Sequence, residues 1–279
     1  MSSPARTAAL PDTLRLGAVH LTVADLDRAV AFYRDAIGLR TQALQDRVAA
    51  MGAGGEDVVV LHEQPGARRA GRHAGLFHSA LLFSSRDELA RAAQRLAVSR
   101  TRVDGASDHG VSEALYLSDL DGNGIELYAD RPRERWNVAA DGEVEMYTRP
   151  LDVPGLLDTV AGEPARSHPD PGLVVGHVHL HVGDLGAAAG FYRDRLGLAL
   201  MTTYPGALFL AAGGYHHHLG VNTWAGDGVG PAPAGTAGLR EWTIVLPPDA
   251  VAAAQERLGV SGDLAEDPWG TRLRLLPAG

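Results

Sequence analysis

The chain contains one long segment twice. Residues 17–39 read GAVHLTVADLDRAVAFYRDAIGL, and residues 176–198 read GHVHLHVGDLGAAAGFYRDRLGL. Each copy begins with a short run of alternating apolar residues, continues with Asp-Leu and ends in a helical pattern. The chain is therefore built from at least two copies of a unit in which a strand precedes a helix. Its length of 279 residues suits two domains.

Both copies carry start and stop signals for their helix. In the first copy Asp25 precedes the helical pattern and Gly38 follows it; Asp184 and Gly197 take these places in the second copy. An Asp side chain at the N-cap accepts a hydrogen bond from the first turn, and a glycine adopts the left-handed conformation that ends many helices. We therefore expect one helix between the two residues of each pair.

Each half also contains a second, weaker strand followed by a helix. Residues 77–83 are expected to form a strand, and Ser85 with Glu88 three positions later is a capping box for the next helix. Residues 241–246 form the corresponding strand in the second half. Short β-like stretches lie between the helices. The pattern predicts an α+β fold of four β-α-β-β-β units, arranged as two pairs.

The two pairs are separated by a proline-rich stretch. We place one domain at residues 14–130, a connector at 131–172 and a second domain at 173–279. The first domain contains most of the candidate site residues described below.

Composition removes several classes of chemistry. The chain has no cysteine, and every basic residue is arginine. Thiol nucleophiles, iron–sulfur clusters, cysteine zinc sites and lysine Schiff bases are therefore excluded. The formal net charge of −9 argues against nucleic-acid and anionic-membrane partners. No apolar run is long enough to span a bilayer, and the first 15 residues lack the apolar core of a signal peptide. We expect a cytoplasmic protein that uses metal, histidine, tyrosine or carboxylate chemistry.

The repeated openings, with their shared VHL and FYRD segments, and the segment LYLSDLDGNGIELY at residues 115–128 resemble the vicinal oxygen chelate superfamily. Glyoxalase I, fosfomycin and bleomycin resistance proteins and extradiol dioxygenases belong to this superfamily. The resemblance covers nearly the whole chain apart from the tail and the connector. It implies tandem vicinal oxygen chelate domains, whose four units form two curled mixed sheets. In that family two units together make a cup that holds one metal ion.

Three residues of the first half stand at the ligand positions that this resemblance implies. They are His20 on the first strand, His78 on the strand that opens the second unit and Glu126 on the last strand. Inward-facing positions on separate strands of a curved sheet can converge on one ion. Two histidines and one carboxylate leave coordination positions open, as in non-heme Fe(II) oxygenases. Glu126 lies in an apolar run, where a metal would offset the cost of burying a charge. The alternative is that all three are ordinary polar strand residues.

Two further residues extend the resemblance toward extradiol dioxygenases. There, a histidine before the final strands acts as acid and base, and a tyrosine upstream of the ligand glutamate contacts the substrate oxygen. His109 and Tyr116 stand at these places, Tyr116 ten residues before Glu126. The alternatives are an exposed loop histidine and a tyrosine that only packs in the core.

The second half departs from the pattern. Alignment of its final strand through Gly270 places Arg272 where Glu126 stands. His179, His218 and Glu241 could still form a second metal site. Residues 216–222 read as a strand, in which alternation would place His216 and His218 on one face. We favour a structural role for this half, in which it packs against the first and shapes its entrance.

The resemblance is strongest to two-domain bacterial catechol-2,3-dioxygenases. It implies an extradiol ring-cleaving dioxygenase that binds Fe2+ through His20, His78 and Glu126 and acts on a small catechol-type aromatic substrate with O2. One alternative is a glyoxalase-like lyase or isomerase that uses Mn2+, Ni2+ or Zn2+, usually with a fourth protein ligand. Another is a non-catalytic drug-binding protein. Edge strands of the expected sheets leave a homodimer open.

Overall fold

The computed structural model describes residues 9–69, 71–140 and 142–279. The expectation that the first 15 residues are not a signal peptide falls partly on residues 1–8, which lie outside this range. Within the described residues, no helix combines the length and the apolar character that a membrane span requires.

The first sheet is mixed and has eight strands. Their order is β16, β17, β15, β2, β5, β4, β3, with β1 paired to β15. The bounds are β1 Arg15–Leu16, β2 Val19–Val23, β3 Arg40–Gln45, β4 Val48–Gly52, β5 Asp57–Glu63, β15 Gly238–Leu246, β16 Leu264–Glu266 and β17 Arg272–Pro277.

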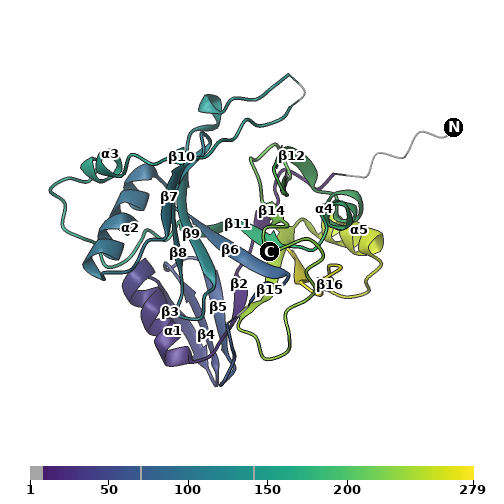
Figure 1. Ribbon diagram of the computed structural model, residues 1–279, viewed down its shortest axis with the longest axis horizontal. Helices are drawn as coiled ribbons and strands as arrows, with labels where there is room; N and C mark the ends of the chain where they lie inside the picture. Colours follow the sequence, from purple (N-terminus) through teal and green to yellow (C-terminus); the bar gives the residue numbers. More distant parts are fainter. Residues whose placement is uncertain (1–8, 70, 141) are drawn as a thin grey trace.

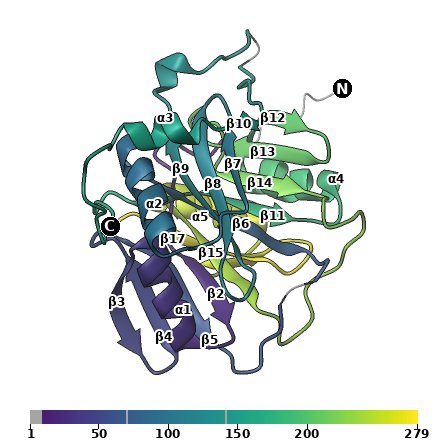
Figure 2. The ribbon, with the colours of Figure 1, turned by 60° about the vertical axis from the view of Figure 1, so that its left-hand side comes forward.

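The second sheet is also mixed and has nine strands, and Figure 2 shows how it curls. Their order is β10, β7, β8, β9, β6, β11, β14, β13, β12. The bounds are β6 Gly75–Leu82, β7 Gly105–Asp108, β8 Ser112–Ser118, β9 Gly124–Asp130, β10 Arg149–Pro150, β11 Val174–His181, β12 Ala199–Tyr204, β13 Ala207–Ala211 and β14 Leu219–Asn222.

Each sheet takes strands from both halves of the sequence. The first unit pairs with the fourth through β2 and β15, and the second unit pairs with the third through β6 and β11. The fourth unit has only β16 and β17 after its helix. The expected α+β fold with two curled mixed sheets is confirmed. Each sheet therefore contains strands from both of the sequence ranges that we expect to be domains, 14–130 and 173–279.

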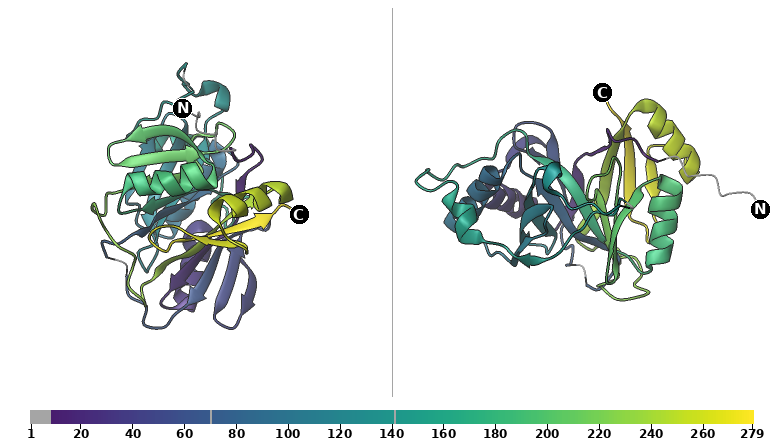
Figure 3. Two further views of the ribbon diagram at one scale, coloured as in Figure 1. Left: turned by 90° about the vertical axis from the view of Figure 1, so that its right-hand side faces the viewer. Right: turned by 90° about the horizontal axis from the view of Figure 1, so that it is seen from above.

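Helices cover the outer faces in two groups (Figures 1 and 3). The helix α1 and its π-helical continuation η1 lie beside α2, while α5 lies beside η3, the continuation of α4. The bounds are α1 Leu26–Phe32, η1 Tyr33–Ile37, α2 Arg86–Val98, α4 Leu185–Ala189, η3 Gly190–Leu196 and α5 Pro248–Leu258. One hydrophobic core includes buried residues of both halves, such as Leu21, Leu127, Leu180 and Leu273.

The expected helix caps are confirmed. The Asp25 side chain accepts a hydrogen bond from the Arg28 backbone N–H, and the Asp184 side chain accepts one from that of Ala187. Gly38 ends the first helix with φ of 90°. A Cβ at this position would lie 2.6 Å from the Ser167 carbonyl oxygen, so only glycine fits there.

The repeated FYRD segment has a structural reason. The Tyr33 hydroxyl donates to Asp119 over 3.3 Å, and the Tyr192 hydroxyl donates to Asp267 over 2.8 Å. Both carboxylates lie in tight turns that lead into the last strand of another unit. Each tyrosine therefore joins the helix of one unit to a turn of the next.

Parts of the connector form regular secondary structure. It contains the short helices η2 (Arg133–Arg135) and α3 (Val153–Asp158), and its strand β10 extends the second sheet beside β7. It packs on the sheet that carries the candidate site and contributes to the cavity described next.

Candidate metal centre

Three buried donors converge inside the second sheet. His78 lies on β6, Glu126 on β9 and His177 on β11, and they are 6%, 3% and 1% exposed. The Nε2 atoms of both histidines lie 3.0 Å from Oε2 of Glu126. One donor atom from each residue lies within 4.8 Å of the other two. Among the described residues, this is the only such group of three.

Strand register explains why these side chains meet. The parallel pairing of β6 and β9 places Ala80 beside Glu126, two residues along the strand from His78. The antiparallel pairing of β6 and β11 places His177 opposite Ala80. The three ligand candidates are therefore neighbours across three adjacent strands, and alternation directs them to the same face.

The protonation states suit a metal ion. Burial lowers the pKa of His177 to about 4, which leaves its imidazole neutral at pH 7. Burial opposes ionisation of Glu126, but the imidazoles of His177 and His78 outweigh it and hold the pKa of the carboxyl well below its usual range. Metal ions bind neutral imidazole and ionised carboxylate. The buried Nε2 of His78 lies 3.0 Å from Oε2 of Glu126 without the geometry of a hydrogen bond, so this atom has no satisfied partner in the protein and is available to a ligand.

The structure does not bring His20 to this group. His20 lies on β2 in the other sheet, where its Nδ1 is 3.0 Å from Nε2 of His62. Its Nε2 lies 3.9 Å from Oε1 of Glu241. The expectation that His20 joins His78 and Glu126 is therefore wrong in space, because the first unit pairs with the fourth and not with the second.

His177 takes the place expected for His20, and the sequence contains a signal for it. His78 stands seven residues before the N-cap Ser85, and His177 stands seven residues before the N-cap Asp184. At the same distance before Asp25 the first unit has Ala18. Alignment of the units on their helix caps identifies the pair His78 and His177, whereas alignment on the VHL segment pairs His20 with His179.

The residues of the possible second site are not together either. His179 lies in the same cup as His78, and its Nε2 is 2.9 Å from the Asn222 amide nitrogen. His218 Nδ1 accepts a hydrogen bond from the Ala212 backbone N–H over 3.2 Å. Glu241 belongs to the other sheet, where it binds Arg274. The alternative of a second site from His179, His218 and Glu241 is therefore not formed.

The three consecutive histidines lie in the turn before β14 and not in a strand. His216 is fully buried, with Nε2 2.9 Å from Oδ1 of Asp130 and Nδ1 2.8 Å from Nδ1 of His217. The His217 ring packs on His177, with ring centroids 4.1 Å apart. The expected strand alternation therefore does not determine which way the side chains of His216, His217 and His218 point. His217 supports the ligand candidate His177 and also lines the adjacent cavity.

His109 and Tyr116 form a hydrogen-bonded pair beside the three donors. Nε2 of His109 lies 2.8 Å from the Tyr116 hydroxyl, and Nδ1 lies 2.8 Å from the Tyr147 carbonyl oxygen. The carbonyl can only accept, so Nδ1 carries the proton and Nε2 accepts from the tyrosine hydroxyl. Burial, reinforced by Glu126, raises the pKa of Tyr116 well above its ordinary value and keeps it protonated. Tyr116 pairs with Glu126 across β8 and β9.

A cavity of about 280 Å³ lies beside these groups, and we call it the inner cavity. His78 and Glu126 lie in its wall together with His109 and Tyr116. The connector contributes the side chains of Met146 and Thr148. The inner cavity is therefore built from both halves and from the connector.

The position equivalent to Glu126 in the third unit holds no donor. Gly220 pairs with His179 in β11 and β14 as Glu126 pairs with Ala80 in β6 and β9. A Cβ at Gly220 would lie 2.8 Å from Cγ of His179, so the histidine ring fills the space of a side chain there. Three protein donors would therefore be available to a metal ion here, beside the inner cavity that His78 and Glu126 line.

The other sheet has an ion pair at the corresponding place. Glu241 faces His20 across β15 and β2 as His78 faces His179 across β6 and β11. Arg274 stands where Glu126 stands, two residues further along the sequence than the expected Arg272. Its guanidinium donates to both oxygens of Glu241, over 2.8 and 3.0 Å. In the first sheet the positive charge at this place therefore comes from the side chain of Arg274, whereas the second sheet has metal-ligand candidates there.

Two family models match parts of this sequence. Residues 15–127 match the glyoxalase/bleomycin resistance protein/dioxygenase superfamily, and residues 175–205 match the bleomycin resistance protein-like N-terminal family. The catechol-2,3-dioxygenase of Bacillus subtilis (strain 168) is 44% identical over 237 residues, which cover 83% of this chain and 82% of that protein.

Solved structures share the fold at low sequence identity. Glyoxalase I from Zea mays is 17% identical, with a TM-score of 0.56, and the match covers 95% of this chain and 92% of that one. A putative dioxygenase from Bacillus subtilis subsp. subtilis str. 168 is 13% identical, with a TM-score of 0.65, and the match covers 97% and 86%.

Proposed function

Because this chain belongs to the glyoxalase/bleomycin resistance protein/dioxygenase superfamily, and within it to the family of the Bacillus subtilis catechol-2,3-dioxygenase, we propose that it is an Fe2+-dependent extradiol dioxygenase. Its substrates would be a catechol-type aromatic compound and O2. The observation that carries the proposal is the buried group of His78, Glu126 and His177, two members of which, His78 and Glu126, line one cavity with the pair His109 and Tyr116.

The donor set favours iron over the metals of a lyase. Two histidines and one carboxylate with open positions are typical of non-heme Fe(II) oxygenases. When bound, the ion would hold both catechol oxygens and O2 at neighbouring positions and allow electron transfer between them. A lyase of this fold usually has a fourth protein ligand, and Gly220 occupies that position. This argues against the glyoxalase-like alternative.

The chain's own residues orient the substrate and move a proton. Tyr116 faces the inner cavity next to Glu126, where its hydroxyl can contact a catechol oxygen. A proton from that oxygen passes to the Tyr116 hydroxyl as the tyrosine proton moves to Nε2 of His109. The Tyr147 carbonyl holds Nδ1 and keeps Nε2 directed at Tyr116. The cavity has no arginine in its wall among the described residues, which suits a catechol without a carboxylate group.

Oxygen uptake tests the proposal. The protein, loaded anaerobically with Fe2+ and then given catechol and O2, should consume one O2 per catechol and release a yellow ring-fission product. Glu126→Ala should abolish uptake and lose stoichiometric iron, measured by elemental analysis, because it removes the only carboxylate among the three donors.

Glu56→Ala is the matched control, since Glu56 is an exposed carboxylate that binds Arg15 on the surface. It should keep both iron and activity. Iron-loaded protein that takes up no O2 with a panel of catechols would contradict the proposal and favour the lyase.

A further inference from the structure

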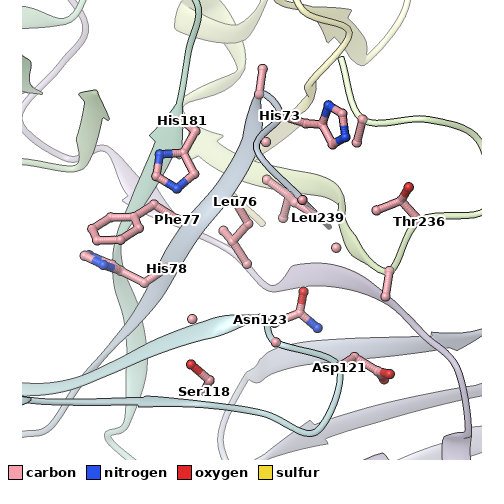
Figure 4. A pocket seen from close by; sticks show the side chains of 18 of the residues that line it. His73, Leu76, Phe77, His78, Ser118, Asp121, Asn123, His181, Thr236 and Leu239 are labelled. Carbon is pink, nitrogen blue, oxygen red and sulfur yellow. The ribbon is translucent and has the colours of Figure 1, made fainter. Parts of the chain in front are cut away.

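A second cavity adjoins the inner one. It has a volume of about 820 Å³ and lies between the ends of the two sheets (Figure 4). We call it the outer cavity. Phe77, His78 and Tyr116 line both cavities, whereas Leu239 and Asp121 line only the outer one. The two spaces therefore meet at Phe77 and its neighbours, directly beside a proposed metal ligand.

An irregularity in β6 places Phe77 at this junction. His78 pairs with His179 of β11, but the next pair is Leu76 with Leu180, so Phe77 is an extra residue without an opposite partner. Such a bulge breaks the alternation of side chains and can redirect one of them. It accounts for two consecutive residues, Phe77 and His78, lining the same cavities. Figure 4 shows both side chains at one side of the outer cavity.

The direction of the Phe77 ring is fixed by other rings. Its centroid lies 4.9 Å from those of His78 and His181, 5.1 Å from that of His179 and 5.5 Å from that of Trp224. These are ordinary distances for packed aromatic side chains. Phe77 is nevertheless 36% exposed, and its open face adjoins the cavities. Phe77 is therefore not a core residue: the neighbouring rings fix its side chain, and its exposed face forms an apolar wall of the cavities.

The size of the inner cavity matches one aromatic ring. An apolar cavity of about 150 Å³ accommodates benzene. On that scale two rings need about 300 Å³, so the 280 Å³ here fits a catechol with a small substituent more closely than a two-ring catechol. The outer cavity offers further space, and a substituent directed there would meet the side chain of Phe77.

We propose that Phe77 determines substrate size by separating the two cavities, and that it restricts this protein to single-ring catechols. This inference rests on the proposed dioxygenase function. Shortening the side chain joins the inner and outer cavities and admits catechols that carry a second ring.

The experiment compares catechol with 2,3-dihydroxybiphenyl on the iron-loaded protein and on Phe77→Ala. The ratio of kcat/KM for 2,3-dihydroxybiphenyl to that for catechol should rise by about tenfold or more in the variant. Dissociation constants of the same compounds, measured anaerobically by calorimetry, should shift in the same direction. Phe77→Leu, a smaller truncation, should give an intermediate ratio and replaces Phe77→Ala if that variant does not fold.

Leu239→Ala is the matched control, because it removes apolar volume from the outer cavity alone. It should leave the ratio unchanged. Wild-type protein that accepts both compounds equally, or Phe77 variants with the wild-type ratio, would overturn the inference. If no oxygen is consumed but the ratio of dissociation constants still shifts, the dioxygenase proposal fails while the role of Phe77 in size selection stands.

Discussion

Two histidines on the first strands of different units show how much depends on single positions. His177 lies in the buried group with His78 and Glu126, whereas His20 lies in the other sheet beside His62. We expect His177→Ala to lose bound iron and to lower catechol turnover by at least about 100-fold, since a ligand is removed. His20→Ala should keep both. The measurement is the iron content and oxygen uptake of the two variants side by side. Loss of iron and activity in His20→Ala but not in His177→Ala would show that His20 is the ligand.

At the same scale, the proton on Nδ1 of His109 sets the direction of the hydrogen bond between His109 and Tyr116. Nδ1 donates to the Tyr147 carbonyl, so Nε2 accepts from the Tyr116 hydroxyl. The Tyr147 carbonyl comes from the connector, a segment that the sequence marked only by its prolines. Met146 and Thr148 on either side of it line the inner cavity. The connector therefore takes part in the site. Nothing in its sequence indicates this, because a backbone carbonyl carries no residue signature.

At the scale of elements, each helix end is specified locally, and Gly38 is the clearest case. Its φ of 90° and the 2.6 Å approach of the Ser167 carbonyl oxygen to a Cβ there leave no room for alanine. Gly38→Ala should lower the free energy of unfolding by about 2 kcal/mol or more. Urea denaturation followed by circular dichroism measures this value.

Gly190 provides the matched control for that substitution. It has a helical φ of −57°, and nothing lies within 4 Å of a Cβ placed there outside its own helix. Gly190→Ala should raise the free energy of unfolding by about 0.5 to 1 kcal/mol. Equal effects of the two substitutions would show that backbone conformation does not determine where the first helix ends.

The histidines buried along the second sheet give the whole molecule a marked pH dependence. Burial lowers the pKa of His177 to about 4 and that of His218 to about 3, and it lowers those of His179 and His217 well below 6.5. As the pH falls below 6.5, the unfolded chain binds protons that the folded protein does not bind. Unfolding is therefore favoured on the acid side.

The free energy of unfolding of the metal-free protein should consequently fall between pH 6.5 and pH 4.5. The expected slope corresponds to about three protons or more. Urea titrations at several pH values in the presence of a chelator measure it. A free energy that is constant over this interval would mean that the histidines are not buried in the neutral form.

The sequence alone determined the units and their local limits. The repeat, the N-cap residues Asp25 and Asp184 and the apolar periodicity are properties of neighbouring residues, so they could be read without knowledge of the fold. The unit pattern predicted the α+β class, and the repeated openings with the segment 115–128 carried the resemblance to the superfamily, which implied the candidates His78 and Glu126. Tertiary structure decided which units share a sheet, and thereby that His177 and not His20 lies beside them. It also decided the direction of Phe77, because that depends on a mismatch in pairing between β6 and β11. Pairing between distant strands is set by the packing of the whole core, and a single strand carries too little information to fix it.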